Sequence, residues 1–315
     1  MSKNKILRPK TLSDIDQRVE RVLRGLGTPE PPLQLSPVRE LLELDRAFYT
    51  ADDPSLLRET VSRLRVAGIQ VFKRPALLAE AVRKFDLRAL YIPDQKRILL
   101  DRSQPALKHR WNEAHEIGHS LLPWHAGVMF GDDQYTLLPA CHEQLEAEAN
   151  FAAGRLLFLR DRFTTQARDY APGIDAVQEL KPIFGNTYTT TFWRCVETWG
   201  ADRPIVGLIT GHPHRARRPA DFDPAKPCRH FIQSRAFAER FARITERELF
   251  AIIVGYCTGG RGGPLGNCEV MLTDDNGEEH LFYFETFSLH HNVLTLGLCL
   301  KPYAAPVATP RASFS

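Results

Sequence analysis

The segment His115-Glu116-Ile117-Gly118-His119 constrains this chain more than any other, because its three polar residues act together only on a helix. Positions four residues apart share one face of an α-helix, so the imidazoles of His115 and His119 can bind one metal ion. Glu116 lies one step round the helix, where its carboxylate can activate a water molecule. The segment therefore predicts a helix that carries a zinc site for hydrolysis of peptide bonds.

Apolar residues around this segment predict a helix with one buried side. One apolar arc of the helical wheel contains Ala114, Ile117, Gly118 and Leu121. Both histidines lie to one side of this arc, so the helix buries one side and offers the other. Pro123 is expected to end the helix. The alternative is a core helix that carries two solvent-exposed histidines.

A catalytic zinc ion takes three protein ligands and leaves one position for water, so a third ligand is needed. His125 has the spacing of the extended motif HExxHxxGxxH, in which glycine lets the backbone turn towards the metal. This chain has Leu122 at the glycine position, followed by Pro123 and Trp124. We therefore expect His125 to be a loop histidine near the mouth of the site.

A second helix, predicted over about residues 141–157, offers a better third ligand. Its apolar stripe comprises Leu145, Ala149, Ala152 and Leu156, widened on one side by Ala153 and Leu157. Glu146 falls inside this arc, whereas Glu148 lies on its far edge and Glu143 near the solvent side. A carboxylate in an apolar arc is costly unless it is paired or binds a metal. Glu146 is thus predicted to complete a His₂Glu zinc set, and an ion pair with a buried arginine is the alternative.

These residues resemble the ImmA/IrrE family of zinc metallopeptidases. The resemblance runs through Arg110-Trp111, Ala114 to His119, Glu146, Ala149-Asn150-Phe151-Ala152-Ala153 and Leu156-Leu157. It extends upstream to Leu90-Tyr91-Ile92 and Ile98-Leu99-Leu100, and weakly downstream to residues 180–194. Asn112 stands where the family usually has threonine, and Leu159 where proline usually closes the second helix.

The resemblance implies an activity and a substrate class. It implies that His115, His119 and Glu146 hold Zn²⁺ while Glu116 is the catalytic base. It further implies a protein substrate, a helix-turn-helix repressor whose cleavage relieves transcription of stress or mobile-element genes. The alternative function is a regulatory binding or sensor protein that uses the zinc-peptidase fold as a scaffold, with a C-terminal domain that senses a signal or binds DNA.

The expected fold class is α+β. The 315 residues are enough for two or three domains. We expect peripheral N-terminal helices over residues 1–52 and a zincin-like minimal metallopeptidase core over 53–168. A small helix-turn-helix-like module over 169–200 precedes a mixed α/β domain over 201–305 and a tail over 306–315. By analogy with some relatives, the 201–305 domain is a candidate sensor.

Helices are expected over residues 14–26, 38–48, 54–68, 77–85 and 236–250. Strands are expected over residues 69–72, 204–210, 251–256, 268–272, 280–286 and 293–298. A hairpin is expected over 89–92 and 97–100, directly before the metal helix. Either of its strands could bind a substrate backbone by strand addition, or the hairpin is fully paired in the core.

Two further polar residues are candidates for stabilising an oxyanion. Tyr135 and His142 lie in or beside the segment that joins the two predicted ligand helices. The alternative, which sequence alone favours, is a plain surface or packing role for each. The helix-turn-helix-like pattern around Gly185-Asn186-Thr187 has a recognition segment, residues 188–194, with one arginine. DNA binding is therefore not expected, and packing against the peptidase core is.

Charge and hydropathy predict a cytoplasmic protein with no membrane partner. The net charge of +3 is nearly balanced and points to no single class of partner. No apolar run reaches membrane-spanning length, and the basic N-terminus has no apolar region after it that would make a secretory signal. The six cysteines show no CxxC pairing and are expected to be reduced thiols.

Overall fold

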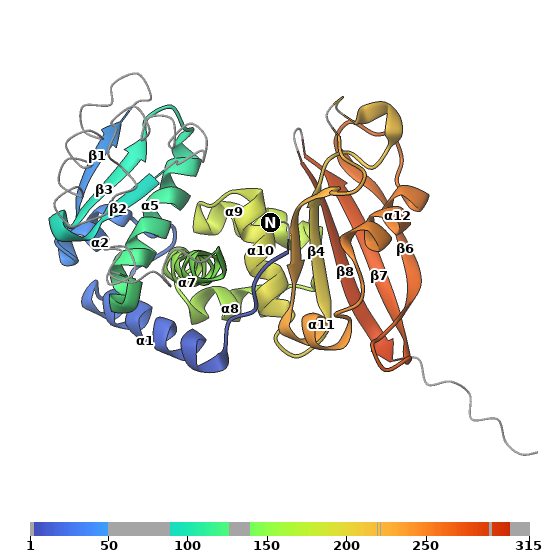
Figure 1. Ribbon diagram of the computed structural model, residues 1–315, viewed down its shortest axis with the longest axis horizontal. Coiled ribbons are helices and arrows are strands. Elements are labelled where there is room, and N and C mark those ends of the chain that lie inside the picture. Colours follow the sequence, from blue (N-terminus) through green and yellow to red (C-terminus); the bar gives the residue numbers. More distant parts are fainter. Residues whose placement is uncertain are drawn as a thin grey trace, which may run out of the picture. The chain divides into compact units, whose positions relative to one another are not determined.

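The computed structural model has a mixed α+β fold (Figure 1) and describes residues 3–49, 89–125, 139–218, 220, 222–289 and 292–302. The chain divides into two compact units. The N-terminal unit comprises residues 7–166 and 180–187, and the C-terminal unit comprises residues 1–6, 167–179 and 188–315. The elements predicted over 54–68, 69–72 and 77–85 lie outside the described residues.

A three-stranded sheet in the order β1-β3-β2 lies in the N-terminal unit. The antiparallel pair β2 (Ala89–Ile92) and β3 (Arg97–Asp101) confirms the predicted hairpin. The turn between them contains a short 3₁₀ helix, η3 (Pro93–Gln95), and Lys96 in the left-handed region. In β3 the side chains of residues 98, 99 and 100 are fully buried, so this strand forms the centre of the sheet.

The helix predicted over residues 38–48 is wrong in its second half. Helix α2 (Leu35–Leu41) ends early, and β1 (Asp45–Tyr49) follows it. Strand β1 runs parallel to β3, with Phe48 opposite Leu100. This pairing joins segments about fifty positions apart, so a pattern of neighbouring residues could not reveal it.

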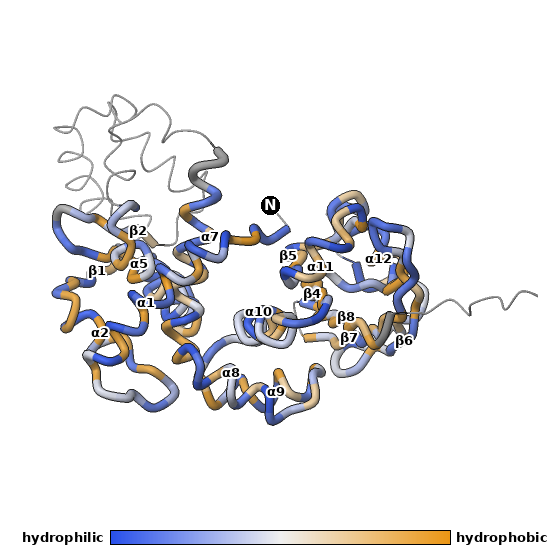
Figure 2. Tube along the Cα trace, turned by 90° about the horizontal axis from the view of Figure 1, so that it is seen from below, coloured by the Kyte–Doolittle hydropathy of each residue, from blue (hydrophilic) through white to orange (hydrophobic). Residues whose placement is uncertain are grey.

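Helix α1 (Pro9–Gly25) is an integral part of the N-terminal unit rather than a peripheral element. Its apolar face buries Ile15 and Val19 completely, and the helix packs across α7 (Pro139–Leu157). Hydrophobic and hydrophilic stretches alternate along the chain (Figure 2), as an amphipathic helix on a core requires. The boundary predicted after residue 52 therefore does not coincide with a boundary between units.

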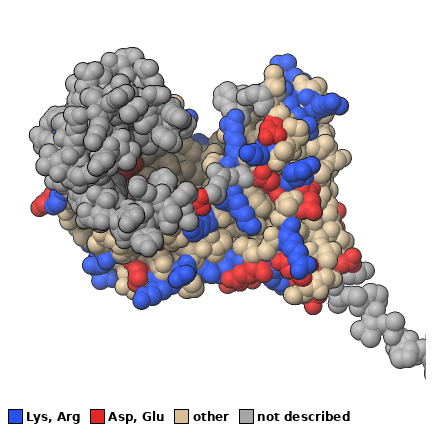
Figure 3. All heavy atoms as spheres, in the orientation of Figure 1, with Lys and Arg blue, Asp and Glu red and all other residues tan. Residues whose placement is uncertain are grey.

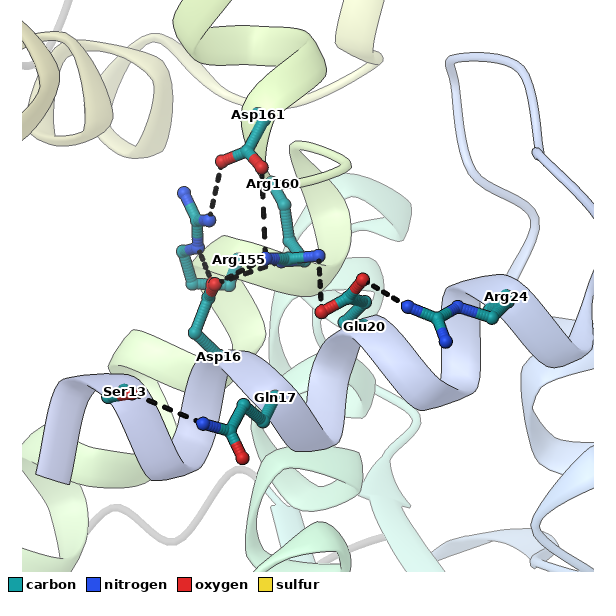
Figure 4. A network of polar contacts seen from close by, with 8 residues as sticks. All are labelled: Ser13, Asp16, Gln17, Glu20, Arg24, Arg155, Arg160 and Asp161. Carbon is teal, nitrogen blue, oxygen red and sulfur yellow. Dashed lines mark hydrogen bonds and ion pairs between the residues drawn. The ribbon is translucent and has the colours of Figure 1, made fainter.

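A network of charged side chains joins α1 to the end of α7 (Figure 4). The carboxylate of Asp16 accepts hydrogen bonds from the guanidinium groups of Arg155 and Arg160, the latter at 2.5 Å from Nη2. Arg155 also contacts Asp161 at 3.0 Å, and Arg160 contacts Glu20 at 3.3 Å. Arg155 is almost fully buried, so its positive charge needs a partner inside the protein. The carboxylate of Asp16 supplies the opposite charge.

The C-terminal unit is built on a five-stranded antiparallel sheet in the order β5-β4-β8-β7-β6. Its strands are β4 (Ile205–Thr210), β5 (Cys228–Gln233), β6 (Gly263–Thr273), β7 (Glu279–Ser288) and β8 (Val293–Pro302). The strands predicted over 204–210, 268–272, 280–286 and 293–298 are confirmed. Strand β5 was not predicted.

Helices cover both faces of this sheet. On one face, Val206 and Leu208 of β4 belong to the same core as Phe237 of α11 (Arg235–Arg240) and Leu249 of α12 (Glu246–Tyr256). On the other face lies α10 (Tyr188–Trp199), so close that a Cβ on Gly207 would meet Phe192 and Val196 at 2.8 Å.

Two predictions for the C-terminal unit are wrong. Residues 251–256 are not a strand but the second half of α12, which begins at a capping box formed by Thr245 and Glu248. The helix predicted over 236–250 is accordingly broken between α11 and α12. A short run of apolar residues fits a strand and a helix alike, so the pattern alone could not separate them.

The predicted pair of helices around residues 185–187 is present as α9 (Ile174–Phe184) and α10. Helix α10 packs on β4 and β5 within the C-terminal unit, whereas the sequence predicted packing on the peptidase core. Arg194, the arginine of the expected recognition segment, is buried and pairs with Glu197 at 3.0 Å. The face of α10 that carries it is therefore packed inside the C-terminal unit.

Among the described residues, no helix is both long and apolar enough to cross a membrane. Lysine and arginine side chains are interspersed with aspartate and glutamate on the face of the C-terminal unit seen in Figure 3. This mixture agrees with the nearly balanced net charge of +3.

The network in Figure 4 predicts that Asp16→Asn destabilises the protein. Loss of hydrogen bonds to two charged groups should lower the free energy of unfolding by about 1–3 kcal/mol in urea titrations near pH 7. Burial alone would raise the pKa of Asp16, but the hydrogen bonds from Arg160 and Arg155 lower it below its ordinary value of 3.8. The difference in free energy of unfolding between wild type and variant should therefore reach its full size above pH 3.8 and shrink as the pH falls below it.

The matched control for this prediction is Glu20→Gln, on the same helix and in the same network but more exposed. An exposed ion pair contributes about 0–1 kcal/mol, so this variant should unfold close to wild type. Equal stability of Asp16→Asn and wild type at neutral pH would contradict the role given to Asp16.

Candidate metal centre

Helix α5 (Ala106–Leu121) carries the HExxH segment. The helix has the predicted buried side, with Ala114 and Ile117 fully buried, and it ends at Leu122, directly before Pro123. The His115 and His119 rings meet edge to face with their centroids 4.8 Å apart. One helical turn thus presents two imidazoles side by side, as the spacing predicted.

Helix α7 brings Glu146 to the same point. Its carboxylate lies 3.2 Å from Nε2 of His115 and 3.6 Å from Nε2 of His119. The two Nε2 atoms lie 3.2 Å apart. Glu146 thus contacts both imidazoles of the HExxH segment.

The chemistry of these donors fits a divalent cation. Nδ1 of His115 contacts Oδ1 of Asn150 at 3.0 Å. A neutral His115 that donates from Nδ1 has its lone pair on Nε2, facing the carboxylate oxygens of Glu146. Lone pairs on three groups directed at one point repel each other unless a cation lies among them. Two imidazole nitrogens and one carboxylate oxygen form the set that catalytic zinc takes.

Burial and neighbouring charges set the protonation of these groups. Burial lowers the pKa of His119 to about 4, which keeps its imidazole neutral, as a metal ligand must be. Burial would raise the pKa of Glu146, but its close contacts with the imidazoles of His115 and His119 lower it well below its usual range. Burial would likewise lower the pKa of His115, but the carboxylates of Glu146 and Glu116 near it raise it.

Glu116 lies beside the cluster without being part of it. Its side chain is buried, and this burial raises the pKa of its carboxyl to about 7. The carboxylate accepts a hydrogen bond from the backbone N–H of Tyr91 on β2, which ties it to the neighbouring strand. A carboxyl group with a pKa near neutrality is suited to taking and releasing a proton.

Helices α5 and α7 cross in close contact at Gly118. A Cβ at this position would lie 2.7 Å from the backbone oxygen of Ala149 and 3.3 Å from Cβ of Ala152. Any side chain at 118 would therefore push α7 away from α5. This glycine, within the HExxH segment itself, lets Glu146 approach the two histidines.

Strand β2 lies against α5 at the edge of the sheet. Among the described strands, β3 is paired on both sides and β2 on one side only. Of the two hairpin strands considered for binding a substrate backbone, only β2 thus retains an edge for strand addition in the described part of the chain.

The prediction that His125 lies in a loop near the mouth of the site is wrong. His125 is fully buried, because the chain folds back after α5 and places its ring 4.9 Å from that of His119. Nδ1 of His125 contacts Nδ1 of His119 at 2.8 Å, and its Nε2 contacts Glu148 at 2.9 Å.

Glu148 was not chosen as a candidate ligand because it lies at the edge of the predicted apolar stripe, yet only 5% of its surface is exposed. Asn150 entered the sequence analysis only as part of a resemblance. The rule that a buried carboxylate needs a partner, which selected Glu146, would have found Glu148 as well.

Neither candidate for stabilising an oxyanion can be placed at the site. Tyr135 lies outside the described residues. His142 lies in the first turn of α7, but its side chain is outside the described part of the structure.

A second cluster of metal-ligating types, which the sequence analysis missed, lies in the C-terminal unit. Asp274, Glu278 and His280 bring their ligand atoms together at the turn between β6 and β7. Nη2 of Arg240 lies 3.2 Å from Asp274, 3.4 Å from Glu278 and 3.3 Å from His280. This guanidinium supplies the positive charge that a metal would otherwise bring, so the cluster is an ion-pair network.

Comparison with known proteins agrees with the site in the N-terminal unit. Residues 64–191 match the family model of the IrrE N-terminal-like domain, a peptidase family. This match supports the resemblance to the ImmA/IrrE family. It covers α5 and α7 completely, so both helices lie in a domain of metallopeptidase type.

None of the curated proteins compared with the chain matches it. Among solved structures, a Mycobacterium tuberculosis transcriptional regulator is similar at 15% identity, with a TM-score of 0.49. The alignment covers 91% of this chain and 88% of that one.

The crossing at Gly118 predicts opposite effects of alanine at two glycines. Gly118→Ala should lower the free energy of unfolding by about 1–3 kcal/mol, because the new methyl group meets backbone that cannot move aside. Gly154→Ala, on α7, meets no atom within 4 Å and should gain up to about 1 kcal/mol from helix propensity. Urea titrations measure both, and stabilisation by Gly118→Ala would contradict the close crossing.

Proposed function

We propose that this chain is a zinc-dependent endopeptidase. In this proposal His115, His119 and Glu146 hold the ion, and Glu116 is the catalytic base. The convergence of the two Nε2 atoms and one carboxylate, from two helices, carries the proposal. The peptidase core is proposed to be zincin-like over residues 53–168, in one compact unit with α1, α2 and β1.

Zinc bound at this site would polarise the scissile carbonyl and acidify a water molecule. Glu116 takes the proton of the attacking water on its carboxylate and delivers it to the nitrogen of the leaving amine. Its hydrogen bond from the Tyr91 N–H holds the carboxylate in one orientation. The neighbouring edge of β2 binds the substrate backbone as an added strand, which aligns the scissile bond with Glu116.

The proposed substrate is a helix-turn-helix transcriptional repressor in the cytoplasm. The family match of residues 64–191 supports this substrate class, through the resemblance on which it was first inferred. Cleavage of such a repressor would relieve transcription of stress or mobile-element genes. Co-expression with a repressor encoded beside this chain, followed by mass spectrometry of the fragments, tests the substrate class.

A second candidate function is sensing by the C-terminal unit, with the peptidase fold as a scaffold. The observation that favours it is an open pocket of about 640 Å³ lined by His214, Arg215, Arg218, Phe222 and Val254, among others. The guanidinium of Arg218 stacks over Phe222 at 4.7 Å, and its Nε is buried without a hydrogen-bond partner. Such a pocket suits a small anion with an apolar body.

Zinc binding is the first requirement of the proposed function. Zinc at 100 times its dissociation constant should stabilise the wild-type protein by about 2.7 kcal/mol, which thermal unfolding detects. Glu146→Gln removes a proposed ligand. Loss of a group that only hydrogen-bonds a ligand weakens metal binding about 10–100-fold, so this variant should lose more than that. Glu143→Gln, on the same helix but outside the cluster, should bind zinc as the wild type does. Equal zinc affinity of all three proteins would exclude Glu146 as a ligand.

Glu116→Gln separates catalysis from metal binding. The variant keeps the three proposed ligands, so it should retain zinc while repressor cleavage falls by about 10²–10⁴-fold. Zinc content by mass spectrometry and cleavage by gel electrophoresis are measured on the same preparation. Unchanged regulation in cells that carry this variant would favour the scaffold over the peptidase.

A further inference from the structure

We propose that Glu148 and His125 form a buried relay that orients His119 and fixes its tautomer, and thereby sets the affinity of the metal site. This inference rests on the proposed zinc site and assigns a positioning role to two residues outside the ligand set. The relay runs from Glu148 through His125 to Nδ1 of His119, on the side of the ring away from Glu146.

The relay begins at a carboxylate surrounded by donors. Oε2 of Glu148 accepts from the indole N–H of Trp124 at 2.6 Å and contacts Nε2 of His125 at 2.9 Å. Oε1 accepts from the amide of Gln144 at 2.6 Å. An indole nitrogen can only donate, and an ionised carboxylate can only accept. Nε2 of His125 therefore donates its proton to Glu148.

The proton on Nε2 of His125 determines where His119 carries its own proton. With its hydrogen on Nε2, a neutral His125 has its lone pair on Nδ1. Nδ1 of His119 lies 2.8 Å from that lone pair and must donate to it. The remaining lone pair of His119 is then on Nε2, the atom that faces His115 and Glu146. The relay thus presents His119 in the only neutral tautomer that can bind a metal at this point.

Packing holds the relay in place. His125 is fully buried, and the chain reversal at Pro123 brings both Trp124 and His125 onto α7. The guanidinium of Arg18, on α1, lies 5.2 Å from the centre of the Trp124 ring. Helix α1 therefore contacts Trp124, which donates to the carboxylate of the relay.

The two histidine ligands are held by different partners. Asn150 holds His115 through a single amide, whereas His119 is held through an imidazole and a carboxylate. Carboxylates behind a histidine ligand raise its basicity and fix its ring, and loss of such a partner typically weakens metal binding about 10–100-fold. Loss of the relay should therefore act on His119 and leave His115 in its tautomer.

The test compares His125→Leu, which has no acceptor, with His125→Gln, whose amide oxygen can still accept from Nδ1 of His119. Competition with a chromophoric chelator should give a zinc affinity about 10–100-fold below wild type for the leucine variant and an intermediate value for the glutamine variant. Glu143→Gln, on the same helix but outside both the cluster and the relay, should stay near wild type. A purely structural role would not produce this order.

Nitrogen-15 NMR of the histidine rings in the metal-free protein gives a readout independent of zinc. His119 should carry its proton on Nδ1 in the wild type and lose that preference in His125→Leu. If the leucine variant does not fold, Glu148→Gln, which keeps the side-chain size, tests the same relay by both measurements.

Two results would overturn the relay. One is a folded leucine variant that binds zinc as tightly as wild type, and the other is a wild-type His119 protonated on Nε2. A wild-type protein that binds no zinc would refute the proposed function instead, while the NMR measurement would still decide on the relay.

Discussion

The contact between α5 and α7 at Gly118 is the constraint on which the rest of the site depends. One helix carries both histidines and the other carries Glu146, so the distance between the helix axes sets the distance between the ligands. The absence of a side chain at 118 lets the backbone of Ala149 approach α5 closely. The partners of the histidines, Asn150 and Glu148, lie on the same stretch of α7. A single helix crossing therefore assembles both the ligands and the groups that orient them.

Much of the site could be predicted from the sequence, because its rules act over one or two helical turns. The spacing of His115 and His119 fixes a shared face on any helix. The apolar arc was expected to bury Glu146, but its side chain is 40% exposed, and the buried carboxylate on this helix is Glu148. The hairpin before α5 and four strands of the C-terminal sheet follow from patterns equally local.

Most of the parts that failed depend on segments far apart in the chain, whereas residues 251–256 failed because their local pattern fits a strand and a helix alike. Strand β1 exists because it pairs with β3, and α10 is buried because β4 presents a glycine to it. His125 was expected near the mouth of the site but is fully buried. The prediction failed because the direction in which a chain leaves a helix depends on what it packs against. Relations of this kind between distant segments have no signature in the spacing of neighbouring residues.

The most direct test of the account is the position of zinc itself, found by anomalous diffraction at the zinc absorption edge from crystals of the zinc-loaded protein. The account predicts one strong peak within about 2.0–2.2 Å of Nε2 of His115, Nε2 of His119 and a carboxylate oxygen of Glu146. Nδ1 of His119 should still face His125. A peak at Asp274, Glu278 and His280 instead, or a zinc ion that Glu146 does not contact, would contradict it.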